Sequence, residues 1–173
     1  MLKLYKIPTR LIIKLHIPLE DIVGDFKEFL ARSKLLKDIA GPDTEELFNL
    51  LKSLTIPEGE HIFKEDDLGD NLYLLLAGTV KISVRSAAPQ SGQDLIRILH
   101  PGDIFGEFSF IDGRRRSASA IALKNCRVAI LARSSFDEFT RKYPQSGLLI
   151  LQNIINVITD RARNIVGLWR SSQ

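Results

Sequence analysis

The residues of this chain that are best suited to chemistry lie in one short segment, residues 102–118. It contains several glycines, the carboxylate of Glu107, three consecutive arginines (residues 114–116) and the hydroxyl of Ser117. Backbone N–H groups of such a turn can form an anion-binding concavity, and an arginine presents a planar fork that matches a phosphate. An ionised carboxylate only accepts hydrogen bonds, which suits the hydroxyls of a sugar. The segment therefore indicates a nucleotide site; the alternative is a solvated loop in which Glu107 pairs with one of its arginines.

The segment shows no nucleophile–base or paired-carboxylate constellation, so we expect a binding protein and not an enzyme. The three histidines (His16, His61 and His100) and the single Cys126 lack zinc-ligand spacing, so no metal or other cofactor is expected. A lone cysteine cannot form an internal disulfide, and no apolar run approaches the roughly 20 residues that span a bilayer. We therefore expect a cytoplasmic protein without a transmembrane segment.

Length and composition describe the scaffold that must position this segment. The chain has 173 residues, of which 45% are hydrophobic and 26% charged, as expected for one soluble globular domain. The formal net charge of +3 is too small to indicate nucleic acid as a partner.

The central region, residues 55–133, has the pattern of antiparallel β-structure. Glycines recur about every ten residues and separate short runs that resemble strands, and residues 80–84 alternate apolar with polar. The expected strands are residues 61–63, 71–76, 79–84, 94–99, 118–123 and 127–132. The predicted fold class is α+β, with an antiparallel, jelly-roll-like β-roll of about eight strands flanked by N-terminal helices and a long C-terminal helix.

The N-terminal region is predicted to be mainly helical. Apolar residues recur at three- and four-residue steps over residues 19–30, and a second helix is expected over residues 43–54 with Asp43 as its N-cap. We expect residues 1–33 to form an N-terminal arm and helix, and residues 34–173 to form the principal domain. The sequence leaves open whether the arm packs on this domain, on a second copy or on a membrane surface.

Two helices are predicted after the roll, a short one over residues 134–143, capped by Ser134 or Ser135, and a long one over residues 145–170. The long helix has two apolar stripes and therefore needs two partners. One stripe suits the strands of the same chain, and the other, which repeats in heptads, suits a second copy; burial of both within one monomer is the alternative. The stripe assigned to a homodimer is Leu148, Leu151, Ile155, Ile158, Ala162, Ile165 and Trp169.

The chain also resembles the cyclic nucleotide-binding domain family, which is shared by the bacterial catabolite activator, the regulatory subunit of protein kinase A and cyclic nucleotide-gated channels. The resemblance covers roughly residues 34–169 and rests on sequence blocks that occur in order. These blocks are Pro57-Glu58-Gly59-Glu60, Gly69-Asp70-Asn71-Leu72-Tyr73, Leu76-Ala77-Gly78-Thr79-Val80, Phe105-Gly106-Glu107 and Arg116-Ser117-Ala118. The family calls the segment that holds the last two blocks the phosphate-binding cassette, here residues 102–118.

This resemblance implies a binding site for cAMP or cGMP in the cassette. Glu107 would accept a hydrogen bond from the ribose 2′-hydroxyl, and Arg116 would pair with the exocyclic oxygens of the cyclic phosphate. Backbone N–H groups and a hydroxyl would complete the cradle, while the first two arginines of the triplet would lie at the surface. The implied ligand-binding residues are Gly106, Glu107, Phe108, Arg116, Ser117 and Ala118.

The C-terminal helix departs from the pattern of the bacterial activator, in which a hydroxyl pair reads the adenine. An ungapped alignment places Arg161 and Ala162 at those positions. Thr159, Arg161 and Asn164 are therefore candidate base contacts, and Arg161 at a dimer surface is the alternative. The base remains open between adenine and guanine.

The leading functional prediction is a cyclic nucleotide sensor whose C-terminal helix closes over the base and transmits binding to a dimer mate or an effector protein. One alternative is a structural or interaction domain of the same fold that binds no ligand, its site filled by a side chain or by the N-terminal arm. A second alternative is the sensor part of a transcription regulator. We expect no nucleic acid to bind this chain itself, because no helix-turn-helix pattern is present.

Overall fold

The computed structural model describes four stretches of the chain. They are residues 28–30, 33–39, 42–85 and 93–171. The predicted N-terminal arm and most of the helix expected over residues 19–30 lie outside them; residues 28–30 are helical. In these stretches, no helix combines the length and the apolar character that crossing a bilayer requires.

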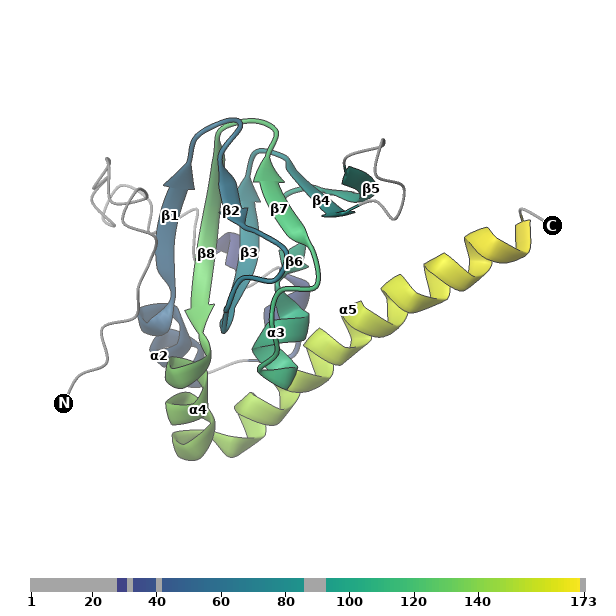
Figure 1. Ribbon diagram of the computed structural model, residues 1–173. Helices are drawn as coiled ribbons and strands as arrows, with labels where there is room; N and C mark the ends of the chain where they lie inside the picture. The colour runs from purple at the N-terminus through teal and green to yellow at the C-terminus, as the bar shows by residue number, and fades with distance from the viewer. Residues whose placement is uncertain (1–27, 31–32, 40–41, 86–92, 172–173) are drawn as a thin grey trace.

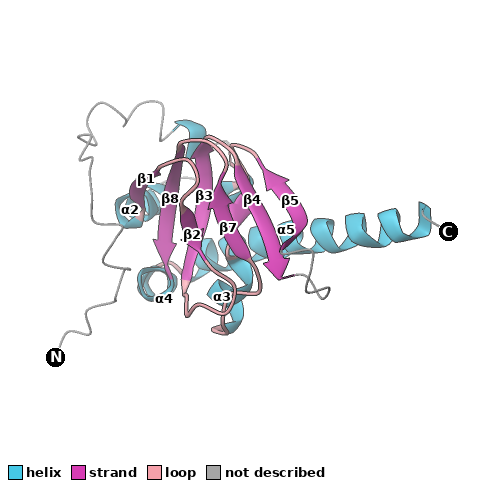
Figure 2. Cartoon of the chain, turned by 45° about the horizontal axis from the view of Figure 1, so that its top comes forward, coloured by secondary structure: helices cyan, strands magenta, loops and turns pink. Residues whose placement is uncertain are grey.

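Within the described residues, eight strands form two four-stranded antiparallel sheets (Figures 1 and 2). The strands are β1 (Lys52–Ile56), β2 (His61–Phe63), β3 (Asn71–Ala77), β4 (Val80–Arg85), β5 (Gln93–Leu99), β6 (Ile104–Phe105), β7 (Ser119–Ala122) and β8 (Cys126–Ala132). The first sheet has the order β1-β8-β3-β6 and the second the order β2-β7-β4-β5. Because helices flank this roll, the predicted α+β fold class is confirmed.

The helices lie at one end of the roll and along one side of it (Figure 1). They are the 3-10 helix η2 (Lys34–Leu36) and the α-helices α2 (Pro42–Leu50), α3 (Glu107–Asp112), α4 (Arg133–Lys142) and α5 (Pro144–Ser171). The first half of α5 lies against the roll, and its C-terminal half projects away from it (Figures 1 and 2).

The helix predicted over residues 43–54 is too long. It ends at Leu50, and residues 52–56 instead form β1, which pairs with β8 from Lys52↔Ile130 to Ile56↔Cys126. The leucines of this stretch have helical spacing, but pairing with β8 overrides that local preference.

Two predicted helix caps are also wrong. Helix α2 begins at Pro42, whose missing N–H costs nothing in the first turn, so Asp43 lies inside the helix. The Asp43 carboxylate instead accepts a hydrogen bond from the Ser146 hydroxyl at 2.7 Å. Helix α4 has Ala132 as its N-cap with no side-chain cap, because β8 runs directly into it, so neither Ser134 nor Ser135 has the predicted role.

Strand β3 separates two apolar cores. Leu72 and Leu74 face a core shared with the helices, and Tyr73 and Leu75 face a core between the two sheets. A strand that is buried on both faces has a continuous apolar run, which explains the sequence of residues 72–77. The second core places the ring of Tyr73 against the cassette.

One apolar stripe of α5 packs on its own chain as predicted, since Ile150 and Ile154 are fully buried in the helix-facing core. The heptad stripe does not form one exposed face. Leu148 and Ile155 are exposed, whereas Ile158 packs partly against the core. The remaining positions of the stripe are Leu151, which also packs against the core, Ala162, which is exposed, and Ile165 and Trp169, whose side chains lie outside the description.

Candidate functional site

The cassette is not the simple loop between strands that the sequence predicts. Strand β6 leads through Gly106 into the six-residue helix α3, which ends at Asp112 and is capped by Gly113. Both glycines have left-handed backbone angles, with φ of 76° and 70°, which side chains disfavour. Helix α3 is too short to show a helical period in the sequence.

The cassette arginine, Arg116, is held from several sides. Its guanidinium donates hydrogen bonds to the carbonyls of Gly106 at 2.9 Å and Asn71 at 3.0 Å, and it lies 4.3 Å from the ring centre of Phe63. Its own backbone exchanges two hydrogen bonds of 2.9 Å with residues 66–67, which follow β2. Main chain and side chain of this residue are therefore both fixed.

Two glycines leave the space that Arg116 occupies. A Cβ atom at Gly69 would overlap the Arg116 Nε atom, and a Cβ at Gly106 would lie 2.6 Å from its Nη1 atom. In the sequence, Gly69 is only one of the glycines that separate the strand-like runs, whereas the structure shows that it also makes room for the guanidinium.

The charge of Arg116 lacks a carboxylate partner in the described structure. The residue is 3% exposed, its hydrogen-bond acceptors are neutral carbonyls, and its buried Nε has no partner among the described residues. Burial lowers the pKa of Arg116, and the charges of Tyr73, Asp70 and Glu107 oppose that effect. A buried cation is stabilised by an anion, so this geometry suits a negatively charged ligand.

The cassette carboxylate, Glu107, is 4% exposed and pairs with a residue of α5. Arg161 Nη1 lies 2.6 Å from Glu107 Oε1, and Arg161 Nη2 donates to the carbonyl of Ile104 at 2.5 Å. The sequence predicts Arg161 as a base contact and leaves open a pairing of Glu107 within the cassette. The partner is instead 54 residues away, on another element.

A cavity of about 560 Å³ lies between the cassette, the β-roll and α5. All six predicted cassette residues line it, as do Arg161 and Asn164. Thr159 does not line it; its hydroxyl donates to the carbonyl of Ile155 at 2.8 Å. Phe105 and Ser109 of the cassette also line it, and the lining residues that the sequence does not single out are mainly apolar: Phe63, Ile82, Ile96, Arg97 and Leu99. In the sequence, most of these residues are marked only by the alternation of apolar and polar residues along the strands that carry them.

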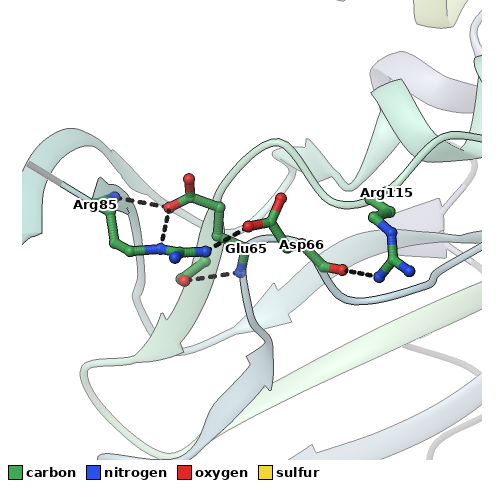
Figure 3. A network of polar contacts seen from close by, with 5 residues as sticks. Glu65, Asp66, Arg85 and Arg115 are labelled. Carbon is green, nitrogen blue, oxygen red and sulfur yellow. Dashed lines mark hydrogen bonds and ion pairs between the residues drawn. The ribbon is translucent and has the colours of Figure 1, made fainter. Parts of the chain in front are cut away.

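The other two arginines of the triplet lie outside this cavity. Arg115 Nη1 donates to the backbone carbonyl of Asp66 at 2.6 Å, and Arg114 is exposed. Figure 3 shows that Arg85, at the end of β4, also contacts the Asp66 carboxylate, and its N–H donates to Glu65 at 2.7 Å. This surface network braces the loop that holds the Arg116 backbone. No cluster of three or more metal-ligating side chains occurs in the described ranges.

Comparison with known proteins agrees with this geometry. A family model described as "Cyclic nucleotide-binding domain" matches residues 53–143, more than half of the chain. The CRP-like cAMP-activated global transcriptional regulator of Mycobacterium tuberculosis is 29% identical over 136 residues, which are 79% of this chain and 58% of that protein. The cAMP-dependent protein kinase regulatory subunit of Emericella nidulans is 31% identical over 111 residues, 64% of this chain and 26% of that protein.

A solved structure extends the similarity to most of the fold. The crystal structure of a cyclic nucleotide-binding domain from Methylobacillus flagellatus has a TM-score of 0.77 and 26% identity, and the match covers 90% of this chain and 86% of that one. The curated relatives are longer than the region that they share with this chain, which spans 58% of the mycobacterial regulator. On the family model and on the fold, the chain belongs to the cyclic nucleotide-binding domain family.

Proposed function

We propose that this chain is a sensor domain that binds cAMP or cGMP in the cavity between the cassette and α5. The observation that carries this proposal is Arg116, a buried arginine whose acceptors are neutral carbonyls and whose Nε has no partner among the described residues. The cyclic phosphate would supply the missing negative charge. The names of the mycobacterial regulator and the fungal kinase subunit, both of which refer to cAMP, support the ligand class.

The rest of the cavity suits the sugar and the base. Glu107 would accept a hydrogen bond from the ribose 2′-hydroxyl, and the Ser117 hydroxyl and the N–H groups of Gly106 and Ala118 would complete the phosphate cradle. Phe108 is 49% exposed at the cavity wall, where a purine would cover its ring. A ligand-free domain would need this space filled, whereas the described residues leave a cavity of about 560 Å³.

The test is calorimetric titration of the chain with cAMP and, separately, with cGMP. We expect Arg116→Ala to weaken binding about 100-fold, because it removes a buried, charge-assisted contact. Arg115→Ala is the matched control, since this neighbouring arginine lies at the surface, and it should bind as the wild type does. Absence of heat and of a thermal shift with both nucleotides, or tight binding by Arg116→Ala, would overturn the proposal.

The proposed output passes through α5 to a second copy of the chain or to an effector protein. The exposed apolar residues of the helix, Leu148, Ile155 and Val166, together with Ala162, suit a homodimer contact. Ile155→Glu should convert a dimer to a monomer in light scattering, while Asn156→Glu, which is exposed on α5 but outside this stripe, should not. A monomeric wild type at high concentration would contradict the homodimer.

The remaining parts of the proposal concern the role of the protein and its location in the cell. The relatives are named as a transcriptional regulator and a kinase regulatory subunit, so we propose a regulatory role in the cytoplasm without catalysis and without a resident cofactor. The division of the chain at residue 33 also stays a prediction.

A further inference from the structure

The first residue of helix α4, Arg133, does not line the nucleotide cavity, yet its side chain bonds the end of the cassette helix α3. We propose that Arg133 is a positioning residue of the nucleotide site: through α3 it fixes the Gly106 carbonyl that orients the guanidinium of Arg116. This inference rests on the proposed function and extends it, because it assigns the alignment of the phosphate-binding group to a residue that touches no ligand.

The guanidinium of Arg133 closes the C-terminal end of α3. Its Nη1 atom donates to two carbonyls there, that of Phe110 and, at 3.1 Å, that of Ile111. The last four carbonyls of a helix lack partners within it, and a basic side chain can supply their hydrogen bonds. A helix of six residues has few internal hydrogen bonds, so its placement depends on contacts of this kind.

Helix α4 contacts α3 at a second point, through an aromatic pair. Phe110 is fully buried, and its ring centre lies 5.3 Å from that of Phe136. Arg133 and Phe136 are three positions apart and therefore lie on the same face of α4. A contact between rings fixes the separation of the two helices but has little directional preference, whereas hydrogen bonds to carbonyls are directional. The two bonds from Arg133 therefore fix the tilt of α3.

A single residue of α3 connects this cap with the acceptor of Arg116. The carbonyl of Phe110 accepts from Arg133, and its N–H donates to the carbonyl of Gly106 at 3.3 Å. The same Gly106 carbonyl accepts a hydrogen bond from Arg116 Nη1 at 2.9 Å. A change in the tilt of α3 therefore moves one of the two carbonyls that orient the cassette guanidinium.

Arg133 is itself fixed relative to the other carbonyl. Its backbone N–H donates to the carbonyl of Asp70 at 3.1 Å, and the next carbonyl in the chain, that of Asn71, accepts from Arg116 Nη2 at 3.0 Å. The side chain is also held by an ion pair of 2.8 Å with Asp137, one turn along α4. Arg133 thus joins α3 to the start of β3, the two segments whose carbonyls bond Arg116.

The alignment of Arg116 matters because a planar fork meets two phosphate oxygens in only one orientation. Stability depends less on Arg133, because 40% of its side chain is exposed and its ion pair with Asp137 lies at the surface. We therefore expect replacement of Arg133 to weaken nucleotide binding while the domain stays folded.

The test is calorimetric titration with cAMP and, separately, with cGMP, well below the unfolding temperature. We expect Arg133→Met, which keeps an unbranched side chain but removes the hydrogen bonds, to weaken binding about tenfold. Arg133→Lys keeps the charge without the fork and should recover part of that loss. Arg141→Met is the matched control, because Arg141 is exposed on the same helix and donates to the carbonyl of Asp137 rather than to α3. It should bind as the wild type does.

A double-mutant cycle tests whether the effect passes through Arg116. In the Arg116→Ala background, Arg133→Met should weaken binding by less than about twofold in an NMR titration, because the group that it positions is gone. A general effect on the fold would weaken binding by the same factor in both backgrounds. Equal factors, or wild-type affinity of Arg133→Met, would overturn the inference.

These outcomes separate the inference from the proposed function. If the wild type binds a nucleotide and Arg116→Ala binds it far more weakly, the proposed function stands whatever the result for Arg133→Met. If the wild type binds neither nucleotide, the proposed function and this inference fail together.

Amide hydrogen exchange without ligand gives a second readout, which does not depend on affinity. The N–H groups of Phe110 and Gly113 bond the carbonyls of Gly106 and Ser109 within α3 and its cap. We expect both to exchange about fivefold faster in Arg133→Met and at the wild-type rate in Arg141→Met. Wild-type exchange rates in Arg133→Met would show that α3 keeps its place without the cap and would overturn the inference.

Discussion

The two walls of the cavity are held in place by different kinds of contact. On the cassette wall, Arg116 is fixed through its backbone, through its guanidinium and by the space that two glycines leave. On the α5 wall, Arg161 is attached by its own two hydrogen bonds, at the point where the helix begins to leave the roll. The cassette is therefore suited to constant recognition, and α5 is suited to a change of position.

The largest expected effect comes from breaking the anchored half of α5. Ile154→Ala removes a fully buried side chain from the core shared with the helices and should lower the free energy of unfolding by about 2–5 kcal/mol. Chemical denaturation measures this loss. The neighbouring Ile155→Ala is the control, because Ile155 is 54% exposed, and it should change stability by less than about 0.5 kcal/mol. Equal losses would mean that the two faces of the helix are equally buried.

The next effect concerns the cassette wall and compares two glycines. Gly106→Ala and Gly113→Ala both place a side chain at a left-handed φ, which costs about 1–2 kcal/mol of stability. Only at Gly106 does the new Cβ meet Arg116, at 2.6 Å, whereas nothing lies near the Cβ at Gly113. We therefore expect Gly106→Ala to lose more stability and at least about tenfold in nucleotide affinity. Equal affinities for the two variants would show that the guanidinium can move without cost.

The contrast between the walls also separates what the sequence could predict from what it could not. Most strands of the roll are visible in the sequence as short strand-like runs between glycines. Their predicted bounds therefore agree with the structure within one or two residues. The cassette residues are adjacent in the chain, and the resemblance to a family placed them together. The prediction failed at β1, where Leu54, the last of a set of leucines with helical spacing, pairs with Val128 of β8, 74 residues later.

The α5 wall depends on tertiary packing, which no local pattern contains. Arg161 could be assigned to the site by alignment, but its partner Glu107 is fixed by the angle at which α5 crosses the roll. The role of Gly69 was missed for the same reason, since its neighbour Arg116 is 47 positions later in the chain. Contacts between distant elements follow from the assembled fold rather than from residue spacing.

A smaller effect tests how the anchored half of α5 is tied to the N-terminal region. Asn153→Ala removes two hydrogen bonds to backbone carbonyls of Leu35 and Lys37 and should cost about 1–2 kcal/mol in unfolding free energy. Asn156→Ala is the control, because Asn156 is exposed on the same helix. A loss no greater than that of the control would mean that apolar packing alone anchors this half.

The smallest effect tests whether the cassette wall is fixed from inside or from its surface. Arg85 contacts Glu65 and Asp66 in the exposed network of Figure 3, and such ion pairs contribute about 0.2–1 kcal/mol and weaken with salt. Since the Arg116 backbone is held by its own hydrogen bonds to residues 66 and 67, Arg85→Ala should change nucleotide affinity less than about twofold, with Arg114→Ala as the surface control. Calorimetry at low and high salt measures both. A salt-dependent loss of tenfold or more in Arg85→Ala alone would show that the surface network positions Arg116, and the cassette would then be as adjustable as α5.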